Sequence, residues 1–233
     1  MLPLAVLAGG FAVRLRPLTK KIPKSLLDVA GEPFIFHQLR LLRKKGIEDV
    51  VLCIGYLGEM IEERVGGGEP FGLRVRYSHD GPRPLGTAGA LRKAAPLLGR
   101  AFFVLYGDSY LDCDYKAVQA AYEQCGRPGL MTVYRNQGQY DNSNVIFEEG
   151  DIIFYDKKNQ RPEMRHIDYG LGILQSRVLE HLPAGEPADL ADVYSKLVLE
   201  GRLAGFESPE RFYEIGSRAG LAELAAKLER ECH

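Results

Sequence analysis

The sequence predicts a three-layer, Rossmann-like α/β fold whose central sheet is mixed but mostly parallel. Short continuous apolar runs, such as Leu4 to Ala8 and Phe102 to Tyr106, are typical of strands that are buried on both faces. These runs alternate with segments of helical character, and such alternation favours parallel strands connected by helices. A glycine-turn hairpin in the second half indicates a small additional β subregion.

In the first half, strands and helices are expected to alternate. The expected strands are Leu4 to Ala8, Asp49 to Ile54, Leu73 to Tyr77, Phe102 to Tyr106 and Leu130 to Tyr134. The expected helices are Phe34 to Lys45, Leu57 to Val65, Thr87 to Ala95, and Asp114 to about Cys125. Gly46 is suited to end the first helix, Pro96 follows the third, and Asp114 is suited to cap the fourth.

The second half is more irregular. Its expected strands are Val145 to Phe147 and Ile152 to Tyr155, which form the hairpin, and Ile167 to Leu174, which Gly170 and Gly172 are expected to break. Its expected helices are Asp189 to Leu199 and Arg218 to Glu229, the latter capped by Ser217. We expect one domain over residues 1–233, with halves of about 1–135 and 136–233, because no repeat or low-complexity linker interrupts the sequence.

The composition excludes several classes of protein. A chain of 233 residues with 45% hydrophobic content has enough material for one large core. The net charge of -1 gives no general attraction for nucleic acid, and no apolar run is long enough to span a membrane, so we expect a cytosolic protein without either partner. The four cysteines form no C-x-x-C pair, which argues against a zinc site, and Cys53 is expected to be a small buried hydrophobe.

A glycine turn follows the first expected strand and precedes two cations. Gly9 and Gly10 leave backbone N–H groups free to bind anionic oxygens, and they let a ligand approach without a Cβ in the way. Arg14 can bind two phosphate oxygens at once, whereas Lys24 supplies a mobile point charge. The segment therefore predicts a polyphosphate site, although a glycine pair of this kind can also be only a turn. Neither the G-x-G-x-x-G nor the G-x-x-x-x-G-K-[ST] pattern is present.

The residues from Leu7 to Thr19, followed by those from Pro23 to Pro33, resemble the N-terminal signature of the sugar-1-phosphate nucleotidyltransferases. That signature reads roughly L-A-G-G-x-G-T-R-L-x-P-L-T, then P-K-P-L-[LV]-x-[VI]-x-G-x-P. Ala12 and Val13 replace its third glycine and its threonine, so phosphate binding would depend more on backbone donors and the two cations. The resemblance implies a nucleotidyltransferase fold. It also implies that Arg14 and Lys24 are catalytic. The nucleotide-binding residues that it implies in this segment are Leu7, Ala8, Gly9 and Gly10.

Two carboxylates match the metal site of this family. Asp108 follows Gly107 at the end of a buried strand, as in the family's G-D motif, which implies a catalytic aspartate that binds Mg²⁺. Glu214 lies where the family usually has the aspartate of a late D-x-G-[ST] motif, which implies a second ligand with altered geometry. Read without the resemblance, Asp108 could be only a turn residue and Glu214 only a surface glutamate.

Four further segments match the binding sites for the base and the sugar. Leu85, Gly86 and Thr87 lie in a P-L-G-T-A-G segment that packs along the base in the family, although they could equally be a turn and an N-cap. No residue there distinguishes guanine from uracil or thymine.

Lys157 lies in a segment similar to F-x-E-K-P, whose lysine faces the sugar phosphate, but Lys158 replaces the proline and both lysines remain candidates. Asp168 lies where many relatives have N-A-G, and Asn144 where many have glycine, so an altered sugar site is implied. Tyr169, beside Asp168, could simply be packed in the core.

The resemblance implies that the chain transfers a nucleoside monophosphate from an NTP to a sugar 1-phosphate, with Mg²⁺ as cofactor and pyrophosphate as product. GTP with a heptose or mannose 1-phosphate is our first expectation, and uridylyl or thymidylyl transfer to another sugar 1-phosphate is the alternative. A catalytically silent nucleotide-sugar-binding regulatory protein is an alternative of another class. A glycosyltransferase is disfavoured because Asp108-Ser109-Tyr110 is not an Asp-x-Asp motif. A homo-oligomer is left open.

Overall fold

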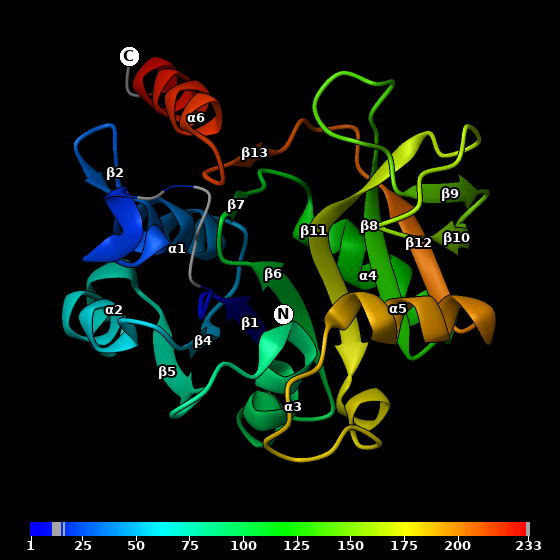
Figure 1. Ribbon diagram of the computed structural model, residues 1–233, viewed down its shortest axis with the longest axis horizontal. Coiled ribbons are helices and arrows are strands. Elements are labelled where there is room, and N and C mark those ends of the chain that lie inside the picture. Colours follow the sequence, from blue (N-terminus) through cyan, green and yellow to red (C-terminus); the bar gives the residue numbers. More distant parts are fainter. Residues whose placement is uncertain (11–14, 16, 232–233) are drawn as a thin grey trace.

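A computed structural model describes residues 1–10, 15 and 17–231. Its main sheet has nine strands in the order β5-β4-β1-β6-β11-β8-β12-β10-β9 (Figure 1). The strands are β1 (Leu4–Leu7), β4 (Asp49–Ile54), β5 (Arg74–His79), β6 (Ala101–Tyr106), β8 (Gly129–Arg135), β9 (Val145–Glu148), β10 (Asp151–Tyr155), β11 (His166–Gln175) and β12 (Leu203–Glu207). Two-stranded sheets pair β2 (Asp28–Val29) with β3 (Glu32–Pro33), and β7 (Ser109–Tyr110) with β13 (Tyr213–Glu214).

Five of the described helices cover the two faces of the main sheet, and the last helix packs on β2 and the first helix instead. The helices are α1 (Phe34–Lys44), α2 (Gly58–Val65), α3 (Gly86–Leu98), α4 (Tyr115–Cys125), α5 (Leu190–Leu199) and α6 (Arg218–Glu231). Short 3-10 helices are η2 (Leu18–Lys20), η3 (Lys24–Leu26), η4 (Glu69–Phe71) and η5 (Ser176–Leu179). None of the described helices is both long and apolar enough to cross a membrane.

The direction of the strands confirms the expected mixed, mostly parallel sheet. β5, β4, β1 and β6 pair in parallel, and so do β8 and β12. Only β11 and β10 run in the opposite direction among the nine strands in the described part of the chain. The parallel strands are connected through helices, as the alternation in the sequence predicted, whereas β9 and β10 form the expected hairpin.

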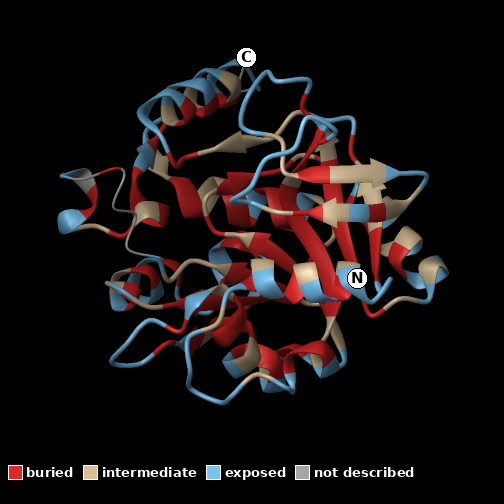
Figure 2. Ribbon diagram, turned by 45° about the vertical axis from the view of Figure 1, so that its right-hand side comes forward, coloured by how far each residue is buried: buried red, intermediate tan, exposed pale blue. Residues whose placement is uncertain are grey.

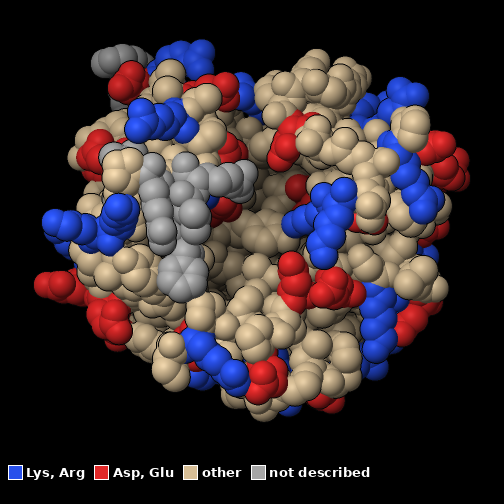
Figure 3. Space-filling view, viewed as in Figure 1, with Lys and Arg blue, Asp and Glu red and all other residues tan. Residues whose placement is uncertain are grey.

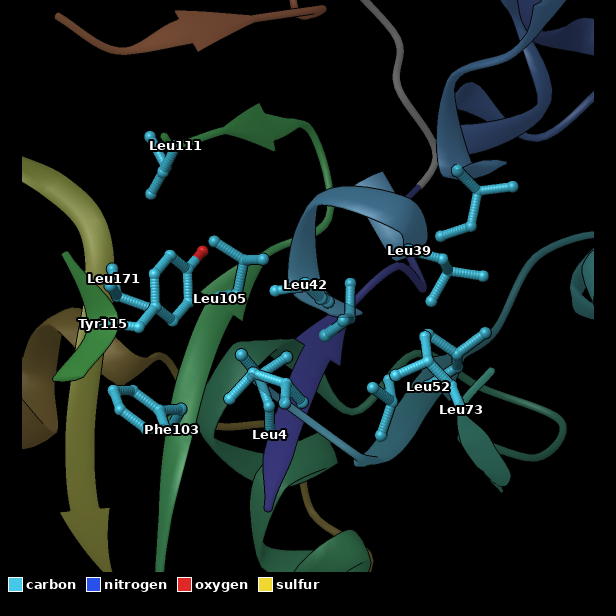
Figure 4. Close-up of a cluster of buried hydrophobic side chains, with 14 of the residues drawn as sticks. Leu4, Leu39, Leu42, Leu52, Leu73, Phe103, Leu105, Leu111, Tyr115 and Leu171 are labelled. Atoms are coloured by element: carbon cyan, nitrogen blue, oxygen red, sulfur yellow. The ribbon is translucent and has the colours of Figure 1, made fainter. Parts of the chain in front are cut away.

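Alternate residues of each central strand enter different cores. Leu4 and Val6 of β1 pack with Leu39 and Leu42 of α1 on one face (Figure 4). Ala5 of β1 packs on the other face, in a cluster that α3 and α5 cover. Because side chains alternate along a strand, a sheet with helices on both faces needs continuous apolar runs. Figure 2 shows the resulting buried sheet between more exposed helices.

The structure corrects three of the predicted boundaries. α3 continues through Pro96 to Leu98, because a proline in the last turn removes only one helical N–H and Leu98 is buried. β11 is one continuous strand from His166 to Gln175. Gly170, at a φ of +94°, marks only an irregularity in its pairing with β8. α6 extends to Glu231.

Helix capping follows the sequence. The side chain of Asp114 accepts hydrogen bonds from the first backbone N–H groups of α4, and Asp189 does the same for α5. The hydroxyl of Ser217 accepts from the N–H of Gly220 at the start of α6. Strand β12, which the sequence analysis did not predict, lies parallel to β8 and extends the sheet.

The last helix closes back over the beginning of the chain. Leu224 and Leu228 of α6 pack with Val29 of β2 and Phe34 of α1, and Ile215 joins the same cluster. Strand β13, just before α6, pairs with β7, so Glu214 lies opposite Ser109. The C-terminal part of the chain therefore lies beside the residues that follow β6.

Candidate active site

A cleft with a volume of about 440 Å³ lies at the carboxyl ends of the parallel strands. Open α/β sheets bind ligands at this edge. Figure 3 shows the hollow near the centre of the molecule. The lining residues come from the ends of β1, β4, β5 and β6, the start of α3, and η3. They are Leu7, Ala8, Gly9, Gly10, Lys24, Ser25, Cys53, Asp80, Pro84, Gly86, Thr87, Ala90, Tyr106, Gly107 and Asp108.

Close backbone contacts explain the glycines of this cleft. The N–H of Gly107 donates to the carbonyl of Leu7, and a Cβ at Gly107 would lie 2.4 Å from that carbonyl oxygen. A Cβ at Gly9 would lie 3.2 Å from the backbone nitrogen of Gly55. The ends of β1, β4 and β6 thus approach one another more closely than larger residues would allow. Gly10 has open space where its Cβ would be, so it exposes backbone to the cleft.

Lys24 and Asp108, which are 84 positions apart in the sequence, meet in this cleft. The ammonium of Lys24 lies 2.6 Å from Oδ2 of Asp108, and the two side chains are 17% and 35% exposed. Lys24 begins η3, whereas Asp108 follows β6. The structure therefore brings together a cation and a carboxylate that the sequence analysis assigned to one triphosphate site. Arg14, Ala12 and Val13, also considered there, lie outside the described residues.

Glu214 approaches Asp108 through the backbone. The N–H of Ile215 donates to the carbonyl of Asp108 at 2.9 Å. The carboxylate of Glu214 turns toward the start of α6, where it accepts from the N–H of Gly216 and from the hydroxyl of Ser217. Within the described ranges, no group of three or more His, Cys, Asp and Glu side chains is placed to hold a metal ion.

Mg²⁺ fits this donor set. It usually takes one or two carboxylates and completes its shell with water and substrate phosphates. Asp108 lines the cleft, and Glu214 pairs with Ser109, the residue after Asp108, in the β7–β13 ladder, so these are the two carboxylates that would hold the ion. The ammonium of Lys24 contacts Asp108 and also lies close to Gly216: a Cβ added at Gly216 would be 3.2 Å from Nζ of Lys24.

Asp80 is a cleft residue that the sequence analysis did not select as a site residue. It follows β5, it is buried, and its Oδ2 accepts from the N–H of Leu85 at 3.2 Å. Burial raises the pKa of its carboxyl above the ordinary value of 3.8, against the opposing effects of the Leu85 N–H and of Lys93. The signal that the sequence offered for Asp80 was an acidic residue just after an expected parallel strand.

The segment before α3 divides between binding and structure. Gly86 and Thr87 line the cleft, whereas the side chain of Leu85 is buried and only its N–H takes part, through Asp80. The hydroxyl of Thr87 accepts from the N–H of Leu190 at 2.7 Å and lies 3.1 Å from Asp189. Thr87 therefore connects the beginnings of α3 and α5.

Lys157, Asp168 and Asn144, from three separate strands or loops, form one hydrogen-bonded group. The ammonium of Lys157 lies 3.1 Å from Oδ2 of Asp168, and the amide oxygen of Asn144 accepts from the N–H of Asp168 at 2.8 Å. Tyr106 connects this group to the cleft, because it lines the cleft and its hydroxyl accepts from Lys157 at 3.1 Å. Tyr106 was not predicted as a site residue.

The structure separates the two neighbouring lysines. The backbone N–H of Lys158 donates to the side chain of Asp156, in an exposed turn. Lys157 instead points to Asp168 and Tyr106, so it is the lysine on the side of the cleft. Tyr169 is buried and its ring stacks on Tyr134, as the packing alternative proposed.

Comparison with known proteins identifies the family. The model of the Nucleotidyl transferase family matches residues 5–231. The chain belongs to this family. The N-acetylmuramate alpha-1-phosphate uridylyltransferase of Neisseria meningitidis serogroup B is 31% identical over 226 residues, covering 95% of this chain and 96% of that protein. The catalytic subunit beta of mannose-1-phosphate guanylyltransferase from Xenopus tropicalis is 30% identical over 217 residues, covering 91% of this chain. The chain spans 60% of the length of that relative.

Solved structures agree with the fold of the family. HddC from Yersinia pseudotuberculosis, complexed with GMP-PN, matches with a TM-score of 0.79 and 23% identity, over 98% of this chain and all of that one. An apo UDP-glucose pyrophosphorylase matches with a TM-score of 0.77 and 18% identity over the whole of both chains. At these identities the likeness shows the fold alone.

Proposed function

We propose that the chain transfers a nucleoside monophosphate from an NTP to a sugar 1-phosphate and releases pyrophosphate. The observation that carries the proposal is the Lys24–Asp108 pair at the rim of a glycine-lined cleft, with Lys157 beyond Tyr106. These groups would bind the two phosphates that must react. The named activities of the similar proteins, uridylyl transfer to N-acetylmuramate 1-phosphate and guanylyl transfer to mannose 1-phosphate, support the same chemistry.

The reaction needs no nucleophile from the protein. An oxygen of the sugar phosphate, already ionised at neutral pH, attacks the α-phosphorus in line while the bond to the β-phosphate oxygen breaks. Catalysis then consists mainly of positioning and charge stabilisation. Lys24 would contact the α-phosphate, the amides around Gly9 and Gly10 would bind the leaving pyrophosphate, and Lys157 would hold the incoming phosphate. Mg²⁺ bound at Asp108 and Glu214 would neutralise phosphate charge.

Asp80 supports GTP as the nucleotide. A carboxylate accepts two parallel hydrogen bonds from N1–H and the 2-amino group of guanine. Uracil and thymine offer it one N–H between two carbonyl oxygens, which repel a carboxylate. Asp80 lies beside Gly86 and Thr87 in the cleft, where the base would bind. We therefore propose guanylyl transfer, with a heptose or mannose 1-phosphate as acceptor, and uridylyl or thymidylyl transfer as the alternative.

A matrix of NTPs against sugar 1-phosphates, scored by pyrophosphate release with and without Mg²⁺, tests this proposal. We expect the fastest release with GTP and a heptose or mannose 1-phosphate, and none without the metal. Release with UTP or dTTP alone would contradict the choice of base. Nucleotide-sugar binding without release from any pair would favour the regulatory alternative, for which the contacts of Glu214 with Gly216 and Ser217 are the structural argument.

A further inference from the structure

The carboxylate of Asp168 is buried behind the wall of the cleft. Its side chain is only 3% exposed, so a ligand in the cleft cannot reach it directly. Its Oδ2 lies 3.1 Å from Nζ of Lys157, 3.2 Å from the hydroxyl of Tyr155 and 3.4 Å from the hydroxyl of Tyr106. Its Oδ1 accepts from the N–H of Gly170 at 3.1 Å. Any effect of Asp168 on a ligand must therefore pass through these neighbours.

Lys157 is the neighbour that remains accessible. Its side chain is 39% exposed, yet its ammonium is held from two directions, by Asp168 and by the hydroxyl of Tyr106. The same ammonium lies 4.7 Å from the ring centroid of Tyr106 and 5.8 Å from that of Tyr155, within cation–π range. A lysine has four rotatable bonds, and these contacts remove much of that freedom.

The ring of Tyr106 also packs against the part of β11 where the pairing with β8 is irregular. The ladder between β11 and β8 shifts between Asp168 and Gly172, with Gly170 at a positive φ inside the shift. A Cβ at Gly170 would lie 3.2 Å from Cδ2 of Tyr106, so the ring packs directly on this glycine. Tyr106 therefore touches the cleft, Lys157 and the bulge that carries Asp168.

We propose that Asp168 and Tyr106 are positioning residues that hold the ammonium of Lys157 where the cleft meets the proposed binding site of the sugar phosphate. The proposal rests on the proposed function, in which Lys157 binds the phosphate of the sugar. The pair pre-orders the cation before substrate arrives, and pre-ordered groups lose less freedom on binding.

The charges around Lys157 agree with this assignment. Burial lowers the pKa of Lys157, but the charge of Asp168 and the hydrogen bond to it outweigh that effect, so the pKa is raised. The other titratable groups that face the ammonium are Tyr106, Tyr155 and Tyr194, with Asp189 farther off. Asp168 is thus the group that contributes most to raising the pKa of Lys157 against the effect of burial.

Kinetics of Asp168→Asn and Tyr106→Phe test the proposal. With the sugar 1-phosphate that turns over fastest in the substrate matrix, we expect KM for the sugar phosphate to rise about tenfold or more, because the cation is no longer fixed. KM for the NTP should change little. The matched controls are Asp151→Asn, which breaks an ion pair with Arg127 away from the cleft, and Tyr115→Phe, which removes a buried hydroxyl without a partner.

A second measurement needs no turnover. NMR of ¹⁵N-lysine protein, with the Nζ signal of Lys157 assigned by Lys157→Arg, follows its titration directly. In the wild-type chain the signal should titrate above the ordinary lysine pKa of 10.5. In Asp168→Asn its midpoint should move to lower pH, because the lowering effect of burial is then opposed only by the smaller effects of Tyr194 and Asp189.

The outcomes separate the two proposals. An unchanged Lys157 titration in Asp168→Asn overturns the positioning role, whatever the enzyme does. A shifted titration with no pyrophosphate release from any substrate pair leaves the positioning of Lys157 intact and overturns the proposed function. An active wild-type enzyme in which the variants raise both KM values equally, or leave both unchanged, also overturns the positioning role.

Discussion

The two walls of the cleft are built in different ways. The proposed nucleotide wall consists of the ends of parallel strands, where Gly9, Gly10 and Gly107 line the cleft and their lack of side chains leaves the backbone accessible. The proposed sugar-facing wall begins at Tyr106, which lines the cleft, and continues into a cluster of side chains from β10, β11 and the loop after β10, joined through Asp168. A backbone wall suits a ligand part common to all substrates, the triphosphate. A side-chain wall can change with the sugar while the sheet stays the same.

The largest effect is expected from the ion pair between Lys24 and Asp108 in the cleft. Lys24→Ala and Asp108→Ala should each lower kcat/KM by about 10²–10³-fold, equivalent to about 2.7–4 kcal/mol, because each removes a pre-positioned charge from the reacting phosphates. Pyrophosphate release measures the loss. Lys45→Ala is the matched control, since Lys45 forms a 2.6 Å pair with Asp112 of similar exposure outside the cleft. Wild-type rates in either cleft variant would contradict the assignment.

Gly107→Ala tests whether the nucleotide wall depends on its backbone. The added Cβ would lie 2.4 Å from the carbonyl oxygen of Leu7, so β1 and β6 must move apart. We expect a loss of about 1–3 kcal/mol in the free energy of unfolding, together with weaker NTP binding. Thermal unfolding and nucleotide titration check both. An unchanged Tm with unchanged affinity would show that the close approach is not needed.

Asp80→Asn should alter the choice of base more than the rate. The amide can no longer accept two hydrogen bonds from guanine, so the preference for GTP over UTP should fall by about tenfold or more. The ratio of the two kcat/KM values measures it. An unchanged ratio would remove Asp80 from base recognition.

The same variant has a pH-dependent effect on stability. Because burial raises the pKa of Asp80 in the folded state, the folded chain holds this proton to higher pH than the unfolded chain does. The free energy of unfolding of the wild-type chain therefore falls as pH rises from 3.8 through the folded-state pKa of Asp80. Asp80→Asn should raise Tm at neutral pH and lose that advantage in acid. Thermal unfolding at the two pH values checks the sign, and an equal difference in Tm at both would contradict it.

Thr87→Val should have the smallest effect. It removes the hydroxyl that accepts from the N–H of Leu190 and bonds Asp189, so the contact between α3 and α5 loosens. We expect a loss of about 1 kcal/mol in the free energy of unfolding with kcat nearly unchanged, measured by denaturant titration and pyrophosphate release. A large fall in kcat without a fall in stability would instead indicate direct contact of the hydroxyl with the nucleotide.

The nucleotide wall was predictable because its chemistry is local in the sequence. An apolar run, a glycine pair and a G-D dipeptide each predict a strand end, and parallel strand ends meet at one edge. The sequence did not show that the side chain of Leu85, an expected nucleotide-binding residue, is buried in the core. A binding segment can contribute its backbone alone, and a residue pattern does not distinguish the two cases.

The sugar-facing wall could not be predicted to the same depth. Tyr106 looked like the last apolar residue of a strand, and only the fold brings its hydroxyl to Lys157, 51 positions away. Gly170 looked like a strand breaker, because the sequence does not show that β6 and β8 hold β11 together from both sides. The bulge and the buried carboxylate depend on pairing between distant strands.

The pairing of β13 with β7 has a consequence for how the enzyme is made. The N–H of Ile215 holds the carbonyl of Asp108, and α6 then packs on Val29 and Phe34. During synthesis the central sheet can begin to form early, but the proposed active site lacks one side until residues 213–231 have left the ribosome. We therefore expect fragments that stop before residue 213 to lack the proposed activity.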